Sequence, residues 1–371
     1  MIRAVWWCVL LACAAGLAAE SSAAKRPVAV RAPADDRRAA ERLLTRIDSL
    51  RIAGKIPGLA VVILRDTTVL AARGLGRADL ERGIAVTPDT PFNIASVTKP
   101  IAAVVALRLV ESGTLDLDRS MRSFARFPAF CTDVREAGGI FFSDYACEDT
   151  ALTLRHLLSM TANGAPGTRF FYNPVSYSWT SRPMAEVSGV PFSTLVDSFI
   201  FRPAGMTRSA RLHRRLPLPP GIAADLALPY HVDSTGRWAL SEPPGPQGDG
   251  AAGGVISTAR DLARFDIALT RGVLLDPASL GSMWHAGRSA AGVALPYGLG
   301  WFVAPLAGET AVWHTGLWEG AYSALYLKLP ARKLTLILLA NSDGLRWDSR
   351  LDEAAIERSP FAQALIEAFP R

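Results

Sequence analysis

Strand-like apolar runs lie near both ends of this 371-residue chain, and the residues between them are mainly helix-like. Near the N-terminus, residues 59–64 and 69–72 flank Asp66-Thr67-Thr68, a pattern that predicts a β-hairpin. Near the C-terminus, four more runs cover residues 299–303, 311–314, 322–329 and 334–340. The two ends are therefore expected to meet in one sheet. The predicted fold class is α/β (α+β): an antiparallel sheet built from N- and C-terminal segments, flanked by helices, with an inserted mainly helical subdomain.

Helix-like patterns precede, separate and follow these runs. The first begins at Asp35, a favourable N-cap, and its apolar face consists of Ala40, Leu43, Leu44, Ile47 and Leu50. Further helices are expected over residues 154–160, from Thr258 onward, and over residues 360–369. A chain of this length exceeds what one small core usually serves. We expect one domain over residues 30–371, with the helical subdomain inside residues 96–285.

Residues 1–24 are typical of a secretory signal peptide and the start of a linker. Arg3 supplies a positive charge, residues 4–15 are apolar, and the small residues Gly16, Ala18 and Ala19 follow. The apolar run is too short for a transmembrane anchor, which needs about 20 residues. We therefore expect an exported protein, periplasmic or secreted, with no transmembrane span. A lipoprotein-like Leu-Ala-Cys sequence ending at Cys13 leaves lipid anchoring open as an alternative.

Two cysteines, Cys131 and Cys147, remain beyond the signal segment and flank Gly138-Gly139. In an oxidising compartment this arrangement predicts a local disulfide, with two buried free thiols as the alternative. No paired histidines lie near them in the sequence, so the two cysteines do not predict a zinc site.

The charge pattern and the histidines argue against two classes of function. The formal net charge is +6, but the basic residues are spread through predicted helices without a basic stripe interleaved with aromatics. A nucleic-acid partner is therefore not expected. The five histidines are scattered and form no H-E-x-x-H pair, which disfavours a metal-dependent hydrolase. We expect no metal and no organic cofactor.

Ser96 and Lys99 form an S-x-x-K pair just before the apolar segment 101–110. Residues three apart share a helix face, so the amine can lie beside the hydroxyl. A serine nucleophile needs such a neighbouring base, and lysine serves as one only when burial lowers its pKa. The alternative is a helix N-cap serine followed by a solvated lysine. The same spacing also occurs at Ser22 and Lys25, so spacing alone is weak.

Two more motifs give the pair its context. Tyr172 lies on a loop that begins with Pro166-Gly167, and His314-Thr315-Gly316 ends a predicted strand. S-x-x-K, a loop tyrosine and H-T-G, in this order, resemble the three signatures of the class C β-lactamase-related serine hydrolases. That group includes penicillin-binding D,D-peptidases, D-aminopeptidases and several esterases. The resemblance spans residues 56–341, with supporting stretches at 86–92, 152–158 and 252–258. It implies a β-lactamase/transpeptidase-like fold.

The resemblance implies a role for each motif. Ser96 would be the acylated nucleophile, Lys99 its base or proton relay, and Tyr172 a second general base. The backbone N–H groups of Ser96 and Leu317 would form the oxyanion hole. His314 holds the place of lysine in K-T-G and would polarise Tyr172 or contact a substrate carboxylate. Without the other motifs, Tyr172 would be read as a packing aromatic and His314 as a residue that merely ends a strand.

Three more residues complete the expected site, and one of them departs from the family pattern. Gly316 would let a substrate approach the backbone closely, beside Thr315. The family's tyrosine is usually followed two places later by a substrate-binding asparagine, whereas here Asn173 comes one place early and Pro174 takes that position. Either the loop rearranges and Asn173 binds substrate, or that contact is absent.

This departure shapes the predicted function. We expect an exported serine hydrolase that forms a covalent acyl-enzyme on a small-molecule or peptide substrate. A D-amino peptide or an ester is favoured over a β-lactam. The alternatives are a catalytically impaired binding or scaffold member of the same fold, and a true class C-type β-lactamase.

Overall fold

The computed structural model describes residues 34–289, 291–346 and 353–370. The predicted signal peptide and Cys13 lie outside these residues. Among the described helices, none has the length and apolar content that crossing a membrane requires.

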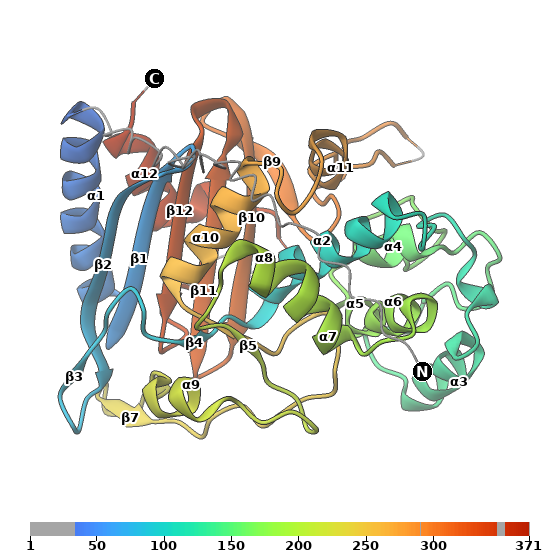
Figure 1. The fold of residues 1–371 in the computed structure, drawn as a ribbon, viewed down its shortest axis with the longest axis horizontal. Helices are drawn as coiled ribbons and strands as arrows, with labels where there is room; N and C mark the ends of the chain where they lie inside the picture. The colour runs from blue at the N-terminus through green and yellow to red at the C-terminus, as the bar shows by residue number, and fades with distance from the viewer. Residues whose placement is uncertain (1–33, 290, 347–352, 371) are drawn as a thin grey trace, which may run out of the picture. The chain divides into compact units, whose positions relative to one another are not determined.

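A seven-stranded antiparallel sheet joins the two ends of the chain (Figure 1). The N-terminal strand β1 pairs with the C-terminal strand β12, so that Leu59 lies opposite Ala340. The predicted antiparallel sheet and its origin in both chain ends are confirmed. In spatial order the strands are β3 (Ile84–Ala85), β2 (Thr68–Asp79), β1 (Gly58–Arg65), β12 (Leu334–Ala340), β11 (Tyr322–Leu329), β10 (Glu309–Trp318) and β9 (Phe302–Leu306).

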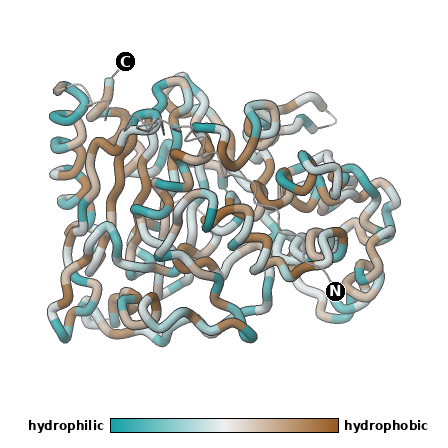
Figure 2. The backbone as a smooth tube through the Cα atoms, in the orientation of Figure 1, coloured by the Kyte–Doolittle hydropathy of each residue, from teal (hydrophilic) through white to brown (hydrophobic). Residues whose placement is uncertain are grey.

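Helices cover this sheet on both faces. The first helix α1 (Ala34–Ala53) and the last helix α12 (Pro360–Ala368) pack against each other, and α1 also contacts β1 and β2. The helix α10 (Ala259–Thr270) crosses the face that is nearer to the viewer in Figure 1. Because both faces are covered, every residue of β11 and β12 is buried. Figure 2 shows the same strands as apolar stretches of the backbone.

The middle of the chain is mainly helical, as predicted. Its disulfide joins Cys131, in α3, to Cys147, which agrees with the sequence prediction. The helix α10 lies inside the predicted 96–285 segment but packs on the large sheet, so the helical subdomain is smaller than that segment. The helices are α2 (Thr98–Glu111), α3 (Phe127–Ala137), α4 (Leu154–Leu158), α5 (Pro174–Trp179), α6 (Ser181–Ser188), α7 (Phe192–Val196), α8 (Arg202–Ala204), α9 (Pro220–Asp225) and α11 (Pro277–Met283).

Short strands and single turns complete the fold. A small sheet holds β4 (Phe92–Asn93), β8 (Val255–Ser257) and β5 (Ala210–Arg211), and a hairpin holds β6 (Tyr230–Val232) and β7 (Trp238–Leu240). The turn η1 (Ala95–Val97) leads from β4 into α2. The remaining 3-10 turns are η2 (Met121–Ser123), η4 (Pro330–Arg332) and η5 (Ile356–Arg358), and the π-helical segment η3 (Asp197–Phe201) connects α7 to α8.

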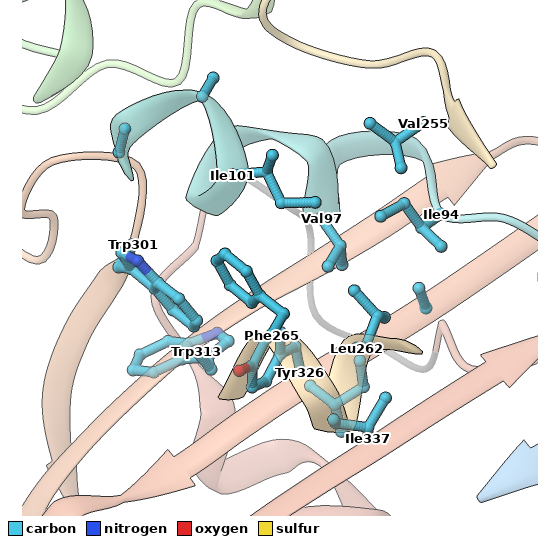
Figure 3. Close-up of a cluster of buried hydrophobic side chains, with 14 of the residues drawn as sticks. Ile94, Val97, Ile101, Val255, Leu262, Phe265, Trp301, Trp313, Tyr326 and Ile337 are labelled. Atoms are coloured by element: carbon cyan, nitrogen blue, oxygen red, sulfur yellow. The ribbon is translucent and has the colours of Figure 1, made fainter. Parts of the chain in front are cut away.

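An apolar core supports η1 and α2 (Figure 3). It fills the space that these two elements share with α10 and the large sheet. Val97 and Ile101 point into this core, as do Phe265 of α10 and Tyr326 of β11. Nearly every residue of α2 is buried, which its apolar composition predicted. The start of α2 is therefore held in place by packing against this core.

One predicted strand boundary is wrong for a steric reason. The run at 299–303 does not begin as a strand, and β9 starts only at Phe302. Residues 298–301 form a turn closed by the Gly298 N–H, which donates to the Trp301 carbonyl. Gly300 has φ +74°, and a Cβ there would lie 2.7 Å from the Lys99 carbonyl oxygen. This turn packs tightly against the first turn of α2.

Candidate active site

Ser96 lies in η1, the tight turn between β4 and α2. The residue before it, Ala95, has φ +47°, which a non-glycine residue adopts only at a cost that its surroundings must offset. The Ala95 N–H donates to Asn93 Oδ1 over 2.9 Å, which helps to hold this conformation. The turn thus presents Ser96 at the N-terminal end of a buried helix.

Lys99 is the immediate partner of Ser96. Its side chain is fully buried, and Nζ lies 2.7 Å from Ser96 Oγ and 3.1 Å from the Ala252 carbonyl oxygen. The ammonium also lies 5.1 Å from the ring centre of Tyr172. Among the described residues no carboxylate pairs with it. Burial lowers the pKa of Lys99 to about 7, so a large fraction is neutral at neutral pH.

Tyr172 packs beside this pair. Its ring stacks on Phe302 with centres 5.9 Å apart, and its hydroxyl is buried without a hydrogen-bond partner in the described structure. Burial raises the pKa of Tyr172, and the nearby Ser96 hydroxyl moderates the rise without meeting hydrogen-bond geometry. The phenol is therefore neutral and unbonded within the described structure. It can donate or relay a proton, but it is not a preformed phenolate base.

His314 does not present a free ring nitrogen to a substrate. It is fully buried, its Nε2 lies 2.8 Å from Tyr297 Oη, and its Nδ1 lies 2.6 Å from the Thr315 carbonyl oxygen. Burial, followed by the charge of Lys99, lowers the pKa of His314 well below its usual value. The neutral ring therefore donates from Nδ1 to Thr315 and accepts at Nε2 from Tyr297. With both ring nitrogens bonded within the protein, nothing here supports the predicted contact with a substrate carboxylate, which stays a prediction.

Asn173 makes hydrogen bonds within the protein, and its predicted role in substrate binding stays a prediction. Its Oδ1 accepts from the Ser176 N–H over 3.0 Å and so caps α5. Its Nδ2 donates to the Phe141 carbonyl over 2.8 Å and to Asn163 Oδ1 over 3.1 Å. Pro174 is the first residue of α5, a position where the missing N–H costs nothing. The altered motif is thus explained as a helix start.

Gly316 serves the protein's own packing. A Cβ at this position would lie 2.2 Å from the Ile94 carbonyl oxygen, so any side chain would push β10 away from the nucleophile turn. The glycine thus allows a close approach of η1 to β10, while its predicted role in substrate approach stays a prediction. That contact sets where Ser96 sits relative to the strand.

The C-terminal half of β10 has one unpaired edge among the described strands. β9 pairs with β10 only as far as Trp313, whereas β11 follows the other edge to Trp318. Thr315 and Leu317 lie in this half, beside η1. Their predicted roles in substrate and oxyanion binding remain predictions, and the free edge is where an added peptide or acyl group would find backbone partners.

Asn93 and Arg211 support the site and were missed by the sequence analysis. Asn93 Oδ1 accepts from the Ala95 N–H and from Trp318 Nε1 over 3.1 Å, which ties the nucleophile turn to the end of β10. Arg211 donates to the Gly253 carbonyl over 2.6 Å and to the Gly250 carbonyl over 2.8 Å. It thereby holds the segment that carries the Ala252 carbonyl. Apart from the local Asn93–Ala95 contact, these partners lie far apart in sequence, so no local spacing reveals the two roles.

The sequence of this chain is similar to those of known proteins. A family model described as Beta-lactamase matches residues 37–359. The chain is 27% identical to penicillin-binding protein 4* of Bacillus subtilis over 314 residues, which cover 74% of this chain and 68% of that protein. It is 25% identical to the esterase EstB of Burkholderia gladioli over 367 residues, covering 82% and 90% respectively.

A solved structure supports the fold. The octameric penicillin-binding protein homologue from Pyrococcus abyssi superposes with a TM-score of 0.70 at 23% identity. The match covers 88% of this chain and 77% of the other. The predicted β-lactamase/transpeptidase-like architecture is confirmed.

Proposed function

Since this chain belongs to the β-lactamase family of serine hydrolases, we propose that Ser96 forms a covalent acyl-enzyme with a neutral ester or amide substrate. The observation that carries this proposal is the 2.7 Å contact between Ser96 Oγ and a fully buried lysine. A pKa of about 7 lets Lys99 accept the serine proton near neutral pH without a second base.

The proposed reaction has two halves. Ser96 Oγ attacks the acyl carbon as Lys99 takes the hydroxyl proton, and the N–H groups of Ser96 and Leu317 stabilise the oxyanion. When the tetrahedral intermediate collapses, the neutral Tyr172 hydroxyl gives its proton to the leaving group and regains one from Lys99. Water then attacks the acyl-enzyme by the same steps in reverse, which releases the acid and restores Ser96.

A preference for uncharged substrates is supported by His314 and Asn173. His314 holds a position where a lysine would offer a cation, but it is buried and neutral with both ring nitrogens bonded. The side-chain amide of Asn173 is hydrogen-bonded to the start of α5 and to the Phe141 carbonyl. A β-lactam needs a partner for its carboxylate and one for its acylamino arm, and neither side chain offers one. Neutral esters, together with D-amino peptide substrates that lack a carboxylate at the reacting end, are therefore favoured.

A substrate panel tests this preference. Purified protein would be compared on a p-nitrophenyl ester, the matched ester with an acyl-side carboxylate, a D-amino acid amide, and a cephalosporin. We expect kcat/KM to be highest for a neutral ester or amide. Cephalosporin turnover that equals or exceeds every ester and amide would overturn the preference and favour a true β-lactamase.

The nucleophile has its own test, which also addresses a non-catalytic binding or scaffold role. Intact mass after incubation with a fluorophosphonate should show one adduct on the wild type and none on Ser96→Ala. Tyr172→Phe should acylate and turn over on the order of 10²-fold more slowly while remaining folded. A folded wild type that takes up no adduct favours the binding role, and equal labelling of Ser96→Ala would show that the nucleophile is misassigned.

We also propose that the protein is exported. The signal-like residues 1–24 support this, and the Cys131–Cys147 disulfide suits an oxidising compartment. Expression of the full chain with fractionation, followed by mass determination of its N-terminus, tests the proposal. Removal of the first residues in the periplasmic or secreted fraction is the expected result. A chain that keeps Met1 and stays in the cytoplasm would contradict it.

A further inference from the structure

A large open cleft of about 1050 Å³ is lined by residues of α6, α7 and the segment that begins with β5. Its lining contains two acidic side chains, Asp197 and Asp249, and a larger set of arginines. None of Ser96, Lys99, Tyr172 and His314 lines it. The arginines are Arg126, Arg182, Arg202, Arg211, Arg214 and Arg215.

Most of this positive charge is uncompensated. Arg202 pairs with Asp197 over 2.5 Å, and Arg211 lies 3.4 Å from Asp249. Within the described part of the chain, the guanidinium groups of the other four arginines have no ion pair or hydrogen bond. All four are exposed. They line the cleft as exposed guanidinium groups without internal partners in the described structure.

Arg211 is different, because it is a buried cation in the lining of the same cleft. It is 2% exposed, its Nη atoms bind backbone carbonyls, and its Nε is buried without a hydrogen-bond partner. Its nearest carboxylate, Asp249, also accepts from the Ser193 N–H over 2.9 Å. The Nε2 of His213, another lining residue, is likewise buried and unpartnered. A buried charge with incomplete partners is costly unless something else completes it.

We propose that this cleft binds a small multivalent anion, a ligand carrying two or more phosphate or carboxylate groups. Guanidinium forks match both groups through paired N–H···O bonds, and several exposed arginines can engage separate anionic groups at once. Arg211 adds a buried cation and His213 a buried, unpartnered ring nitrogen to the same lining. The acyl substrate of Ser96 is a different molecule, because the preference argued for that site is for uncharged groups.

Isothermal titration calorimetry on the full-length protein tests the proposal. The probes are tripolyphosphate, citrate and orthophosphate, which separate phosphate from carboxylate recognition and multivalent from monovalent binding. We expect saturable binding of tripolyphosphate or citrate, clearly tighter than orthophosphate, and weaker as salt is raised from 50 to 300 mM because the rim arginines are screened.

Paired variants locate the binding. The double variant Arg214→Ala/Arg215→Ala should weaken the multivalent probe by about tenfold or more, since two charge-assisted contacts are lost. The control is Arg42→Ala/Arg46→Ala on α1, which removes the same charge from exposed, unpaired arginines elsewhere. It should change affinity by less than about twofold. Thermal melting and fluorophosphonate labelling of Ser96 should match wild type in both variants, which verifies folding.

Two results would overturn the proposal. One is no saturable binding of tripolyphosphate or citrate to a wild type whose Ser96 labels normally. The other is an equal loss of affinity in the cleft variant and the α1 control, which would mean that only the net charge matters. Neither result bears on acylation of Ser96, so the cleft and the hydrolase site are judged separately.

Discussion

Lys99 and Arg211 are two buried cations that donate to carbonyls of the same segment, residues 250–253, yet they serve different ends. Lys99 has no carboxylate partner, and burial lowers its pKa to about 7. Burial also lowers the pKa of Arg211, but a guanidinium starts so high that it keeps its proton. The same desolvation therefore makes a base of the lysine beside Ser96 and a fixed positive charge of the arginine in the cleft.

The largest expected effect comes from replacing Lys99 by residues that differ in charge but cannot act as a base. Lys99→Met and Lys99→Arg should both slow acylation of Ser96 by a factor on the order of 10²–10⁴. Intact-mass kinetics with a fluorophosphonate measures this, with circular dichroism to confirm folding. If Lys99→Arg keeps more than about a tenth of the wild-type rate, positive charge rather than proton acceptance is what Ser96 needs.

Replacing Lys99 and replacing Arg211 should change the free energy of unfolding in opposite directions. The pKa of Lys99 falls from 10.5 to about 7 on folding, so the unfolded chain binds more protons between these values. The buried lysine therefore lowers the free energy of unfolding. This loss is complete below pH 7 and disappears as pH rises toward 10.5. Lys99→Met should therefore raise the free energy of unfolding at pH 7 by up to about 4 kcal/mol, and by progressively less toward pH 10.

Arg211→Met should do the reverse. It leaves the Gly250 and Gly253 carbonyls without their donor and should lower the free energy of unfolding by roughly 2–4 kcal/mol. Urea unfolding of both variants at pH 7 and pH 9 checks the pair. Destabilisation by Lys99→Met at pH 7 would contradict the idea that Lys99 is held at a cost.

A smaller effect is expected in the pH profile of acylation. Only neutral Lys99 accepts the proton, so the rate with a neutral probe should rise about tenfold from pH 6 to pH 8, with a midpoint near 7. Above the midpoint it should level off. Stopped-flow acylation with a neutral ester measures the profile, and a rate that is flat from pH 6 to pH 8 would sink this assignment.

The smallest expected effect concerns Asp249, the carboxylate nearest Arg211. Asp249→Asn keeps an oxygen for the Ser193 N–H but removes a negative charge from the cleft. Tripolyphosphate affinity should rise by about threefold, while the acylation midpoint stays near 7. Calorimetry and the same pH profile check the two halves. Weaker tripolyphosphate binding in this variant would contradict the electrostatic account.

Parts of the molecule that rest on local patterns were predicted well from sequence. The hairpin of β1 and β2, the strands β11 and β12, and the cap of α10 by Thr258 all follow from periodicity and short-range hydrogen bonding. Ser96 and Lys99 were brought together correctly because they are three residues apart on one turn. Their chemistry depends on burial, which the apolar composition of α2 already indicated.

What the sequence does not reveal is long-range partners. The sequence predicts that Asn173 binds substrate, whereas in the structure its Nδ2 donates to Asn163 and to the Phe141 carbonyl. The sequence predicts that His314 contacts a substrate carboxylate, whereas in the structure its Nε2 is hydrogen-bonded to the Tyr297 hydroxyl. In both cases the side-chain type was compatible with the predicted role. The competing partner was set by tertiary packing, which no spacing in the sequence reveals.

The pairing of β1 with β12 has a consequence for how the protein is made. Leu59 finds its partner strand only after residue 340 has been synthesised, and Ser96 meets β10 only once residues 309–318 exist. A nascent chain that ends before β10 would carry the nucleophile and its lysine but not Leu317. Contacts across such sequence distances close slowly, because a long loop must be ordered first. Hydrolytic activity should therefore emerge late, as one of the last properties the folding chain acquires.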